Sequence, residues 1–265
     1  MSIPKKISYC WFGNNPLPEK VGKCIESWKK YCPDYEIIRW DETNYDVNKI
    51  PFTRDAYKEK KWAFVSDYAR LDIVNEIGGI YLDTDVELVK NIDFMLDQEA
   101  FFALEKGNYS IATGLGFGAE PNNIHVRKQM EVYENTSFYK EDGSLNMKAC
   151  PVISTEYFEQ VGFEKKDVLQ RIGDCTIYPS EYFCPMDFQG NMKMTENTVG
   201  IHLYDATWLD KSDKHIHHVE MKINQMLPAK ISEVVCKIYR NGYRLVEYIQ
   251  KGVIIEKLIK KIKKG

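Results

Sequence analysis

Several features that define common classes of protein are absent from this sequence of 265 residues. No two of its seven cysteines have the CxxC spacing of zinc ribbons or thioredoxin-type redox sites. No hydrophobic run is long enough to span a bilayer, and Met1 to Ser8 lacks the apolar stretch of a signal peptide. The formal net charge is −3, so no basic field favours nucleic acid. We therefore expect reduced thiols, a cytoplasmic location and no nucleic-acid partner.

What is present suits a globular domain. Hydrophobic residues make up 44% of the chain and charged residues 28%, which supplies both a core and a solvated surface. The length allows one sizeable domain with at most a small appendage. The aromatic share of 13% can fill that core, and it also offers stacking surfaces for bases and sugars. No oligomeric state follows from these features.

The spacing of apolar residues predicts strands that alternate with helices. The expected strands cover residues 7–12, 35–40, 80–82, 100–104, 115–119, 176–178 and 199–203, and the expected helices 18–31, 62–77 and 123–134. This alternation predicts an α/β fold with a mainly parallel central sheet and flanking helices. From residue 229 onward the pattern becomes a long, basic, amphipathic helix. We expect one domain over residues 1–228 and a helical tail over residues 229–265.

An acidic pair follows the short apolar segment of residues 80–82. In an extended segment side chains alternate, so Asp83 and Asp85 are expected on the same face with Thr84 opposite. Two adjacent carboxylates repel one another unless a positive charge lies between them, and a hard divalent cation meets that need. Ligands also bind at the carboxyl ends of strands in open α/β sheets. The sequence therefore predicts a divalent-cation site here.

Three functions use such a site. The residues Asp83-Thr84-Asp85-Val86 match the DxDx(T/V) pattern of haloacid-dehalogenase-type phosphatases, in which Asp83 would be the nucleophile. That class also needs a downstream acidic motif, for which Gly173-Asp174 is the only faint candidate. A second function is metal-assisted departure of a nucleoside diphosphate. A third is a non-catalytic module that binds nucleotide or glycan.

The sequence resembles glycosyltransferase family 32, the DxD-containing sugar transferases, in two blocks. These are IPKKISYCWFGNNPLPEKVGKCIESWKKYCPDYEIIRWDE and AFVSDYARLDIVNEIGGIYLDTDV, with weaker similarity to about Trp208. The second block is also similar to the clostridial glucosylating toxins. The resemblance implies a GT-A-like fold and a retaining, metal-dependent hexosyltransferase. Bacterial members of the family often serve capsule or surface-polysaccharide synthesis.

The resemblance also implies roles for residues of the two blocks. Trp11 would stack on the donor base, although a core tryptophan is the simpler interpretation. Asp67 and Arg70 share a helix face and would bind the ribose and the donor sugar or diphosphate, although a surface ion pair would look the same. Asp85 would be a direct metal ligand. Asp83 would hold ribose and sugar hydroxyls and reach the metal through water.

A later segment, IHLYDATW, resembles the family's histidine-containing segment before a tryptophan. His202 would be a third metal ligand, Thr207 would donate to the diphosphate, and Trp208 would close over the donor. Glu181 and Asp187 flank an aromatic loop, and either one could contact the acceptor or be a solvated acid.

The expected reaction moves a hexose from a nucleotide-diphosphate sugar, with a UDP-sugar favoured, to a glycan or lipid-linked acceptor. Arg70 and the cation, Mn²⁺ or Mg²⁺, would offset charge on the leaving diphosphate, and the acceptor hydroxyl would attack from the same face. The basic segment Lys257–Lys264 is compatible with a solvated helix, with self-association, or with peripheral contact with the inner face of a membrane.

Overall fold

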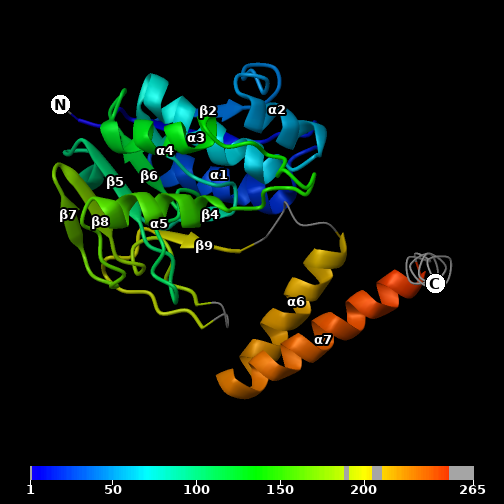
Figure 1. The fold of residues 1–265 in the computed structure, drawn as a ribbon. Coiled ribbons are helices and arrows are strands. Elements are labelled where there is room, and N and C mark those ends of the chain that lie inside the picture. The colour runs from blue at the N-terminus through cyan, green and yellow to red at the C-terminus, as the bar shows by residue number, and fades with distance from the viewer. Residues whose placement is uncertain (1, 188–190, 205–210, 251–265) are drawn as a thin grey trace. The chain divides into compact units, whose positions relative to one another are not determined.

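The computed structural model describes residues 2–187, 191–204 and 211–250 (Figure 1). Its elements are β1 (Lys6–Cys10), α1 (Glu19–Tyr31), β2 (Glu36–Trp40), α2 (Pro51–Lys58), α3 (Trp62–Ile77), β3 (Gly79–Tyr81), β4 (Val86–Leu88), the 3₁₀ turn η1 (Asp93–Met95), β5 (Ala100–Ala103), β6 (Phe117–Ala119), α4 (Ile124–Glu134), α5 (Cys150–Gln160), β7 (Gln170–Ile172), β8 (Cys175–Tyr178), β9 (Gly200–His202), α6 (Lys211–Met226) and α7 (Ala229–Gln250). The chain forms two compact units, one of Met1–Asp187 with Met192–Trp208 and one of Phe188–Asn191 with Leu209–Gly265.

The first unit is built on a seven-stranded sheet with the order β2-β1-β3-β6-β5-β8-β7. The pairs β1–β2, β1–β3 and β5–β8 are parallel, whereas β6 runs antiparallel to β3 and β5, and β7 runs antiparallel to β8. Five of the seven strands therefore run in one direction. The predicted α/β class with a mainly parallel central sheet is confirmed.

Both faces of the sheet are buried. Neighbouring residues of one strand contribute to different clusters: Tyr81 and Phe102 belong to the cluster that α2 to α5 complete, and Ile80 and Phe101 to the cluster that α1 and β4 complete. This is the alternation expected of strands covered on both sides. Figure 1 shows helices flanking these strands.

Helix α3 has the predicted bounds because a glycine pair ends it. Gly78 has a φ of +63°, a conformation that suits glycine, and its N–H donates to the carbonyl of Val74 at 2.9 Å. A side chain at this position would also lie 2.7 Å from Pro121. The chain then turns directly into the central strand β3.

A small second sheet lies beyond β3. Strands β4 and β9 pair antiparallel, with Val86 opposite His202. Helix α1 holds β4 from the other side, because the indole of Trp28 donates to the carbonyl of Val86 at 2.8 Å and the amide of Leu88 donates to Ser27 Oγ at 2.9 Å. This sheet brings a segment near residue 200 next to the acidic pair.

The second unit contains α6 and α7, which pack against each other. Arg240 pairs with Glu220 at 2.6 Å, and Ser212 donates to Glu247 at 2.9 Å. Helix α7 fits the helical pattern expected from residue 229. The predicted domain boundary after residue 228 falls between these two helices, and it stays a prediction. No described helix is long and apolar enough to cross a membrane.

Candidate functional site

The candidate site lies where two adjacent parallel strands end. The register pairs Ser8 of β1 with Tyr81 of β3, so Trp11 and Asp83 both lie just past the carboxyl ends of their strands. Trp11 is half-buried, and its indole N–H donates to the carbonyl of Asn15 at 2.7 Å. The ring therefore retains an exposed part beside the acidic turn. Its stacking role stays a prediction.

The acidic segment is a turn, so the prediction of an extended backbone here is wrong. The N–H of Val86 donates to the carbonyl of Asp83 at 3.1 Å, which closes a four-residue turn. Thr84 is buried, whereas the two carboxylates are partly exposed. The turn gives them different partners, because Asp83 faces α3 and Asp85 faces β9.

Asp83 belongs to a buried group of charges. The guanidinium of Arg70 lies 3.1 Å from Asp67 and 3.3 Å from Asp83, and Asp83 also accepts a hydrogen bond from the Tyr81 hydroxyl at 3.2 Å. The side chains of Arg70 and Asp67 are 4% and 9% exposed. The interpretation of Asp67 and Arg70 as a surface ion pair is therefore wrong, because α3 turns this face into the molecule.

Two further residues, Cys150 and Gly114, lie against this group. The Cys150 sulfur, at the start of α5, lies 3.7 Å from the Arg70 guanidinium and hydrogen-bonds to Asp67. Gly114 comes so close that a Cβ there would lie 2.0 Å from Asp83 Oδ2. Glycine at this position allows the backbone to approach the carboxylate.

Burial changes the protonation of this group. It raises the pKa of the Asp67 carboxyl to about 6, and Arg70 only partly opposes the shift. Burial also raises the pKa of the Cys150 thiol, which stays protonated and can donate to Asp67. Arg70 is therefore the one fixed positive charge of the group and is shared between Asp67 and Asp83.

Asp85 faces the imidazole of His202. Asp85 Oδ1 and His202 Nε2 lie 3.4 Å apart, and each side chain is 15% exposed. Burial alone lowers the pKa of His202, but the carboxylates of Asp85 and Asp83 outweigh it and raise that pKa. His202 Nδ1 is buried and has no hydrogen-bond partner among the residues that the structure describes. The pairing of β4 with β9 thus brings together two residues that lie far apart in the sequence.

The chemistry of this pair fits a divalent cation that also binds substrate. Two ligands at about 2.1 Å on neighbouring octahedral positions lie about 3 Å apart, close to the separation of Asp85 and His202. No group of three or more His, Cys, Asp or Glu residues that could hold a metal occurs in the described part of the chain. Magnesium is commonly held by one or two protein ligands together with substrate phosphates and water, so such a group is not required.

Other candidate residues lie elsewhere. Thr207, Trp208 and the segment Lys257–Lys264 fall outside the described residues. Gly173-Asp174 forms the turn of the β7–β8 hairpin, with Gly173 at a φ of +58°. Strands β6, β5 and β8 separate β7 from β3, so this motif does not meet Asp83 as a phosphatase would require.

Residues 18–102 match the family model described as a glycosyltransferase sugar-binding region containing a DXD motif. The match includes Asp67, Arg70, Asp83 and Asp85. The chain is also 29% identical over 111 residues to the subversion of eukaryotic traffic protein A of Legionella pneumophila. That alignment covers 32% of this chain and 17% of that protein.

Several solved structures are similar to this chain at low identity. The PaToxG glycosyltransferase is 20% identical with a TM-score of 0.47, over 60% of this chain and 69% of that chain. A glycosyltransferase involved in glycosylation of the major capsid of PBCV-1 is 12% identical with a TM-score of 0.45, over 82% and 98%. The galactosyltransferase LgtC, in complex with donor and acceptor sugar analogs, is 13% identical with a TM-score of 0.43, over 85% and 98%.

Proposed function

We propose that this chain, whose residues 18–102 belong to the DXD-containing sugar-binding region of glycosyltransferases, transfers a hexose from a nucleotide-diphosphate sugar to an acceptor hydroxyl. The observation that supports this most is the convergence of Arg70, Asp83, Asp85 and His202 at the carboxyl end of the central strand β3. That edge is where α/β sheets bind their ligands.

Each residue of the site has a distinct task in this proposal. Trp11 stacks on the base of the donor with the exposed part of its ring. Asp83 accepts hydrogen bonds from hydroxyls of the ribose and the sugar, and Arg70 orients it through their 3.3 Å contact. Asp67 and Cys150 fix the guanidinium in turn. Because Arg70 is already in position, no reorganisation is needed as negative charge grows on the leaving diphosphate.

Asp85 and His202 would hold a divalent cation, Mn²⁺ or Mg²⁺. When bound, the cation acts as a Lewis acid that neutralises charge on the diphosphate. His202 would bind it as the neutral imidazole through Nε2, the nitrogen that faces Asp85. Thr207 and Trp208 follow β9 in the sequence, and we assign them to the diphosphate and to closure over the donor.

The finer assignments follow the family resemblance. The acceptor hydroxyl would attack from the face that the diphosphate leaves, which retains the anomeric configuration. A UDP-sugar is the favoured donor, and a glycan or lipid-linked acceptor of bacterial surface-polysaccharide synthesis is the favoured acceptor. Helix α7 exposes Ile231, Val234 and Ile238, a pattern that suits peripheral contact with the inner face of a membrane together with Lys257–Lys264.

Hydrolysis of a nucleotide sugar in the presence of Mn²⁺ tests the proposal directly. The wild-type protein should release nucleoside diphosphate from at least one member of a panel of UDP- and GDP-sugars. Asp85→Asn should slow this release about 100-fold or more, because the amide binds the cation poorly and the leaving charge loses its partner. Liquid chromatography of the nucleotides gives the rate.

An acidic triplet elsewhere in the chain supplies the matched control. Asp97 and Glu99 have the same spacing as Asp83 and Asp85, but both are exposed, and neither is part of the proposed site. Asp97→Asn should hydrolyse the donor at the wild-type rate. Equal rates for Asp85→Asn and the wild type would refute the metal assignment. Release of phosphate from small phosphomonoesters, without action on nucleotide sugars, would favour the phosphatase instead.

A further inference from the structure

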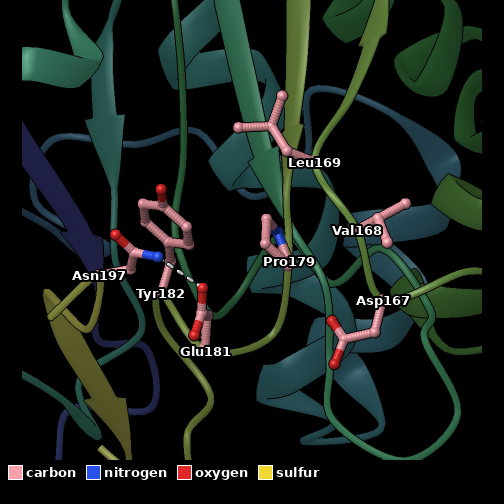
Figure 2. A pocket seen from close by; sticks show the side chains of 7 residues that line it. All are labelled: Asp167, Val168, Leu169, Pro179, Glu181, Tyr182 and Asn197. Carbon is pink, nitrogen blue, oxygen red and sulfur yellow. Dashed lines mark hydrogen bonds between the residues drawn. The ribbon is translucent and has the colours of Figure 1, made fainter. Parts of the chain in front are cut away.

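A cavity of about 460 Å³ opens beside the β7–β8 hairpin, away from the charged group of the candidate site. Figure 2 shows Tyr182, Glu181 and Asn197 along one part of its wall, and Asp167 and Leu169 along the rest. Its volume lies within the range of small-molecule sites, about 300–1,000 Å³. None of the described residues assigned to the donor or the cation lines this cavity.

One part of the cavity wall is aromatic and apolar. Tyr182 is half-buried, and its ring packs against Tyr178 at a centroid separation of 4.7 Å. Phe94, whose side chain is 55% exposed, lies beside both rings at 6.4 Å. Leu169 is also exposed although it is apolar. Of these residues, Tyr182 and Leu169 line the cavity, and they offer an apolar platform for the C–H face of a sugar ring.

The two carboxylates of the wall are acceptors held in fixed positions. Glu181 accepts a hydrogen bond from the Asn197 side-chain amide at 2.7 Å, as the dashed line in Figure 2 marks. Both oxygens of Asp167 are anchored, because Ser180 donates to them from its backbone and from its hydroxyl at 2.7 Å each. Each carboxylate oxygen can accept a further bond. Such planar acceptors suit neighbouring hydroxyls of a pyranose.

The charge of the wall selects against anions. The described lining includes two carboxylates, Asp167 and Glu181, and no lysine or arginine. A phosphate, sulfate or acidic sugar would be repelled and would find no partner. A neutral sugar can donate hydroxyl hydrogens to both carboxylates and cover the ring of Tyr182.

The cavity is joined to the candidate site through the backbone. The carbonyl of Tyr182 accepts from the amides of Val199 and Gly200 at 2.9 Å, and the carbonyl of Phe183 accepts from the amide of His202 at 3.0 Å. The loop that lines the cavity therefore borders β9, the strand that carries His202. A glycan bound in the cavity would lie in the same compact unit as the proposed site of transfer.

We infer that this cavity binds a neutral pyranose of the acceptor glycan, as a subsite apart from the donor. The assignment of this sugar to the acceptor rests on the proposed function. The inference that the cavity binds a sugar rests on the cavity alone. Tyr182 is the platform, and Glu181, Asn197 and Asp167 accept the hydroxyls.

Nitrogen-15 NMR titration of the full chain tests the site with methyl glycosides of glucose, galactose and N-acetylglucosamine. At least one should shift the amides of Glu181, Tyr182 and Asn197. Methyl glucuronide, which differs from methyl glucoside by one carboxylate, should shift none of them.

Glu181→Gln should weaken the binding about tenfold, because a charged acceptor becomes neutral while the side chain keeps its shape. Glu196→Gln, an exposed acid next to Asn197, should bind as the wild type does.

The outcomes separate this inference from the proposed function. Titration of Asp85→Asn should still shift the amides of the cavity, even though that variant is expected to lose donor hydrolysis. A wild-type protein that hydrolyses nucleotide sugars but shows no shift at the cavity with any of the three glycosides overturns the subsite and leaves the proposed function standing. Shifts at the cavity without any donor hydrolysis sustain the sugar site and refute the transferase. Equal binding of glucoside and glucuronide, or of the wild type and Glu181→Gln, overturns the subsite.

Discussion

Arg70 carries a full charge although its side chain is only 4% exposed, and its guanidinium lies between Asp67 and Asp83. An isolated buried charge is costly, so each member of this group depends on the others. A lysine at this position could not replace the planar fork that reaches Asp67, Asp83 and Cys150 together. In the sequence, Asp67 and Arg70 look like an ordinary i, i+3 ion pair. Only their burial in the fold distinguishes them from an ion pair on a solvent-exposed helix surface.

The stability of the protein should depend on pH through Asp67. Burial raises the pKa of its carboxyl to about 6, above the ordinary value near 4. Asp67 therefore contributes stability that is fully present below about pH 4 and is lost as pH rises through 6. Relative to Asp67→Asn, the wild type should lose up to about 3 kcal/mol of unfolding free energy between pH 4 and pH 7. Urea unfolding at several pH values measures this.

Asp41 provides a control of opposite sign. Hydrogen bonds from Thr43 lower the pKa of the Asp41 carboxyl, so its contribution is present above about pH 4 and lost only below it. The difference between Asp41→Asn and the wild type should be flat between pH 4.5 and pH 7. If Asp67→Asn gives the same flat difference, the Asp67 carboxyl titrates normally and its proposed environment is wrong.

At the scale of elements, the short strand β4 depends on α1. β4 has three residues, and its position fixes the turn that carries Asp83 and Asp85. Ser27→Ala removes the hydroxyl that accepts from the buried amide of Leu88. The unsatisfied amide should cost about 1–3 kcal/mol of unfolding free energy, measured by urea denaturation. Hydrogen exchange at the Leu88 amide should be faster by the factor that corresponds to this loss of unfolding free energy.

Ser144→Ala is the control for this element. Its hydroxyl also makes a hydrogen bond, to Asp142, but in an exposed loop where water can replace the partner. We expect a change within about 0.5 kcal/mol. A loss of stability in Ser27→Ala no larger than in Ser144→Ala would mean that the Leu88 amide finds another partner.

The elements differ in how well the sequence predicts them. Helix α3 was predicted to the residue, because its apolar spacing is long and Gly78-Gly79 ends it. Strands β4 and β7 were not predicted, since three residues carry too little periodicity. The segment of Asp83 and Asp85 was predicted as extended, although it is a turn. The sequence identifies the acidic pair, but the geometry of the pair depends on the pairing of β4 with β9.

At the scale of the whole molecule, both hydrophobic clusters belong to the first compact unit: one ends at Ile177 and the other at Tyr204. The helices α6 and α7 hold each other through their own contacts, among them the pair of Arg240 with Glu220. A chain that ends at Trp208 should therefore fold, and circular dichroism and urea unfolding should show one cooperative transition. A truncated chain without a transition would show that the first unit needs the second.

The same truncation tests the proposed membrane contact. Full-length protein should sediment with vesicles that contain anionic lipid, because α7 and the lysines after it combine apolar and basic side chains. The chain that ends at Trp208 should stay in the supernatant. Equal sedimentation of the two proteins would contradict the proposed membrane contact through the tail.

The sequence alone determined the class of fold, the helix that carries Asp67 and Arg70, and the position of the acidic pair after a central strand. These are local properties, set by periodicity and by glycines that end a helix. Tertiary structure decided the rest: that Arg70 is buried between two carboxylates, that His202 faces Asp85, and that Tyr182 and Asn197 line a cavity. Those arrangements depend on the pairing of distant segments. β4 and β9, for example, lie more than 100 residues apart in the sequence. No local pattern encodes which distant segment a short strand will join.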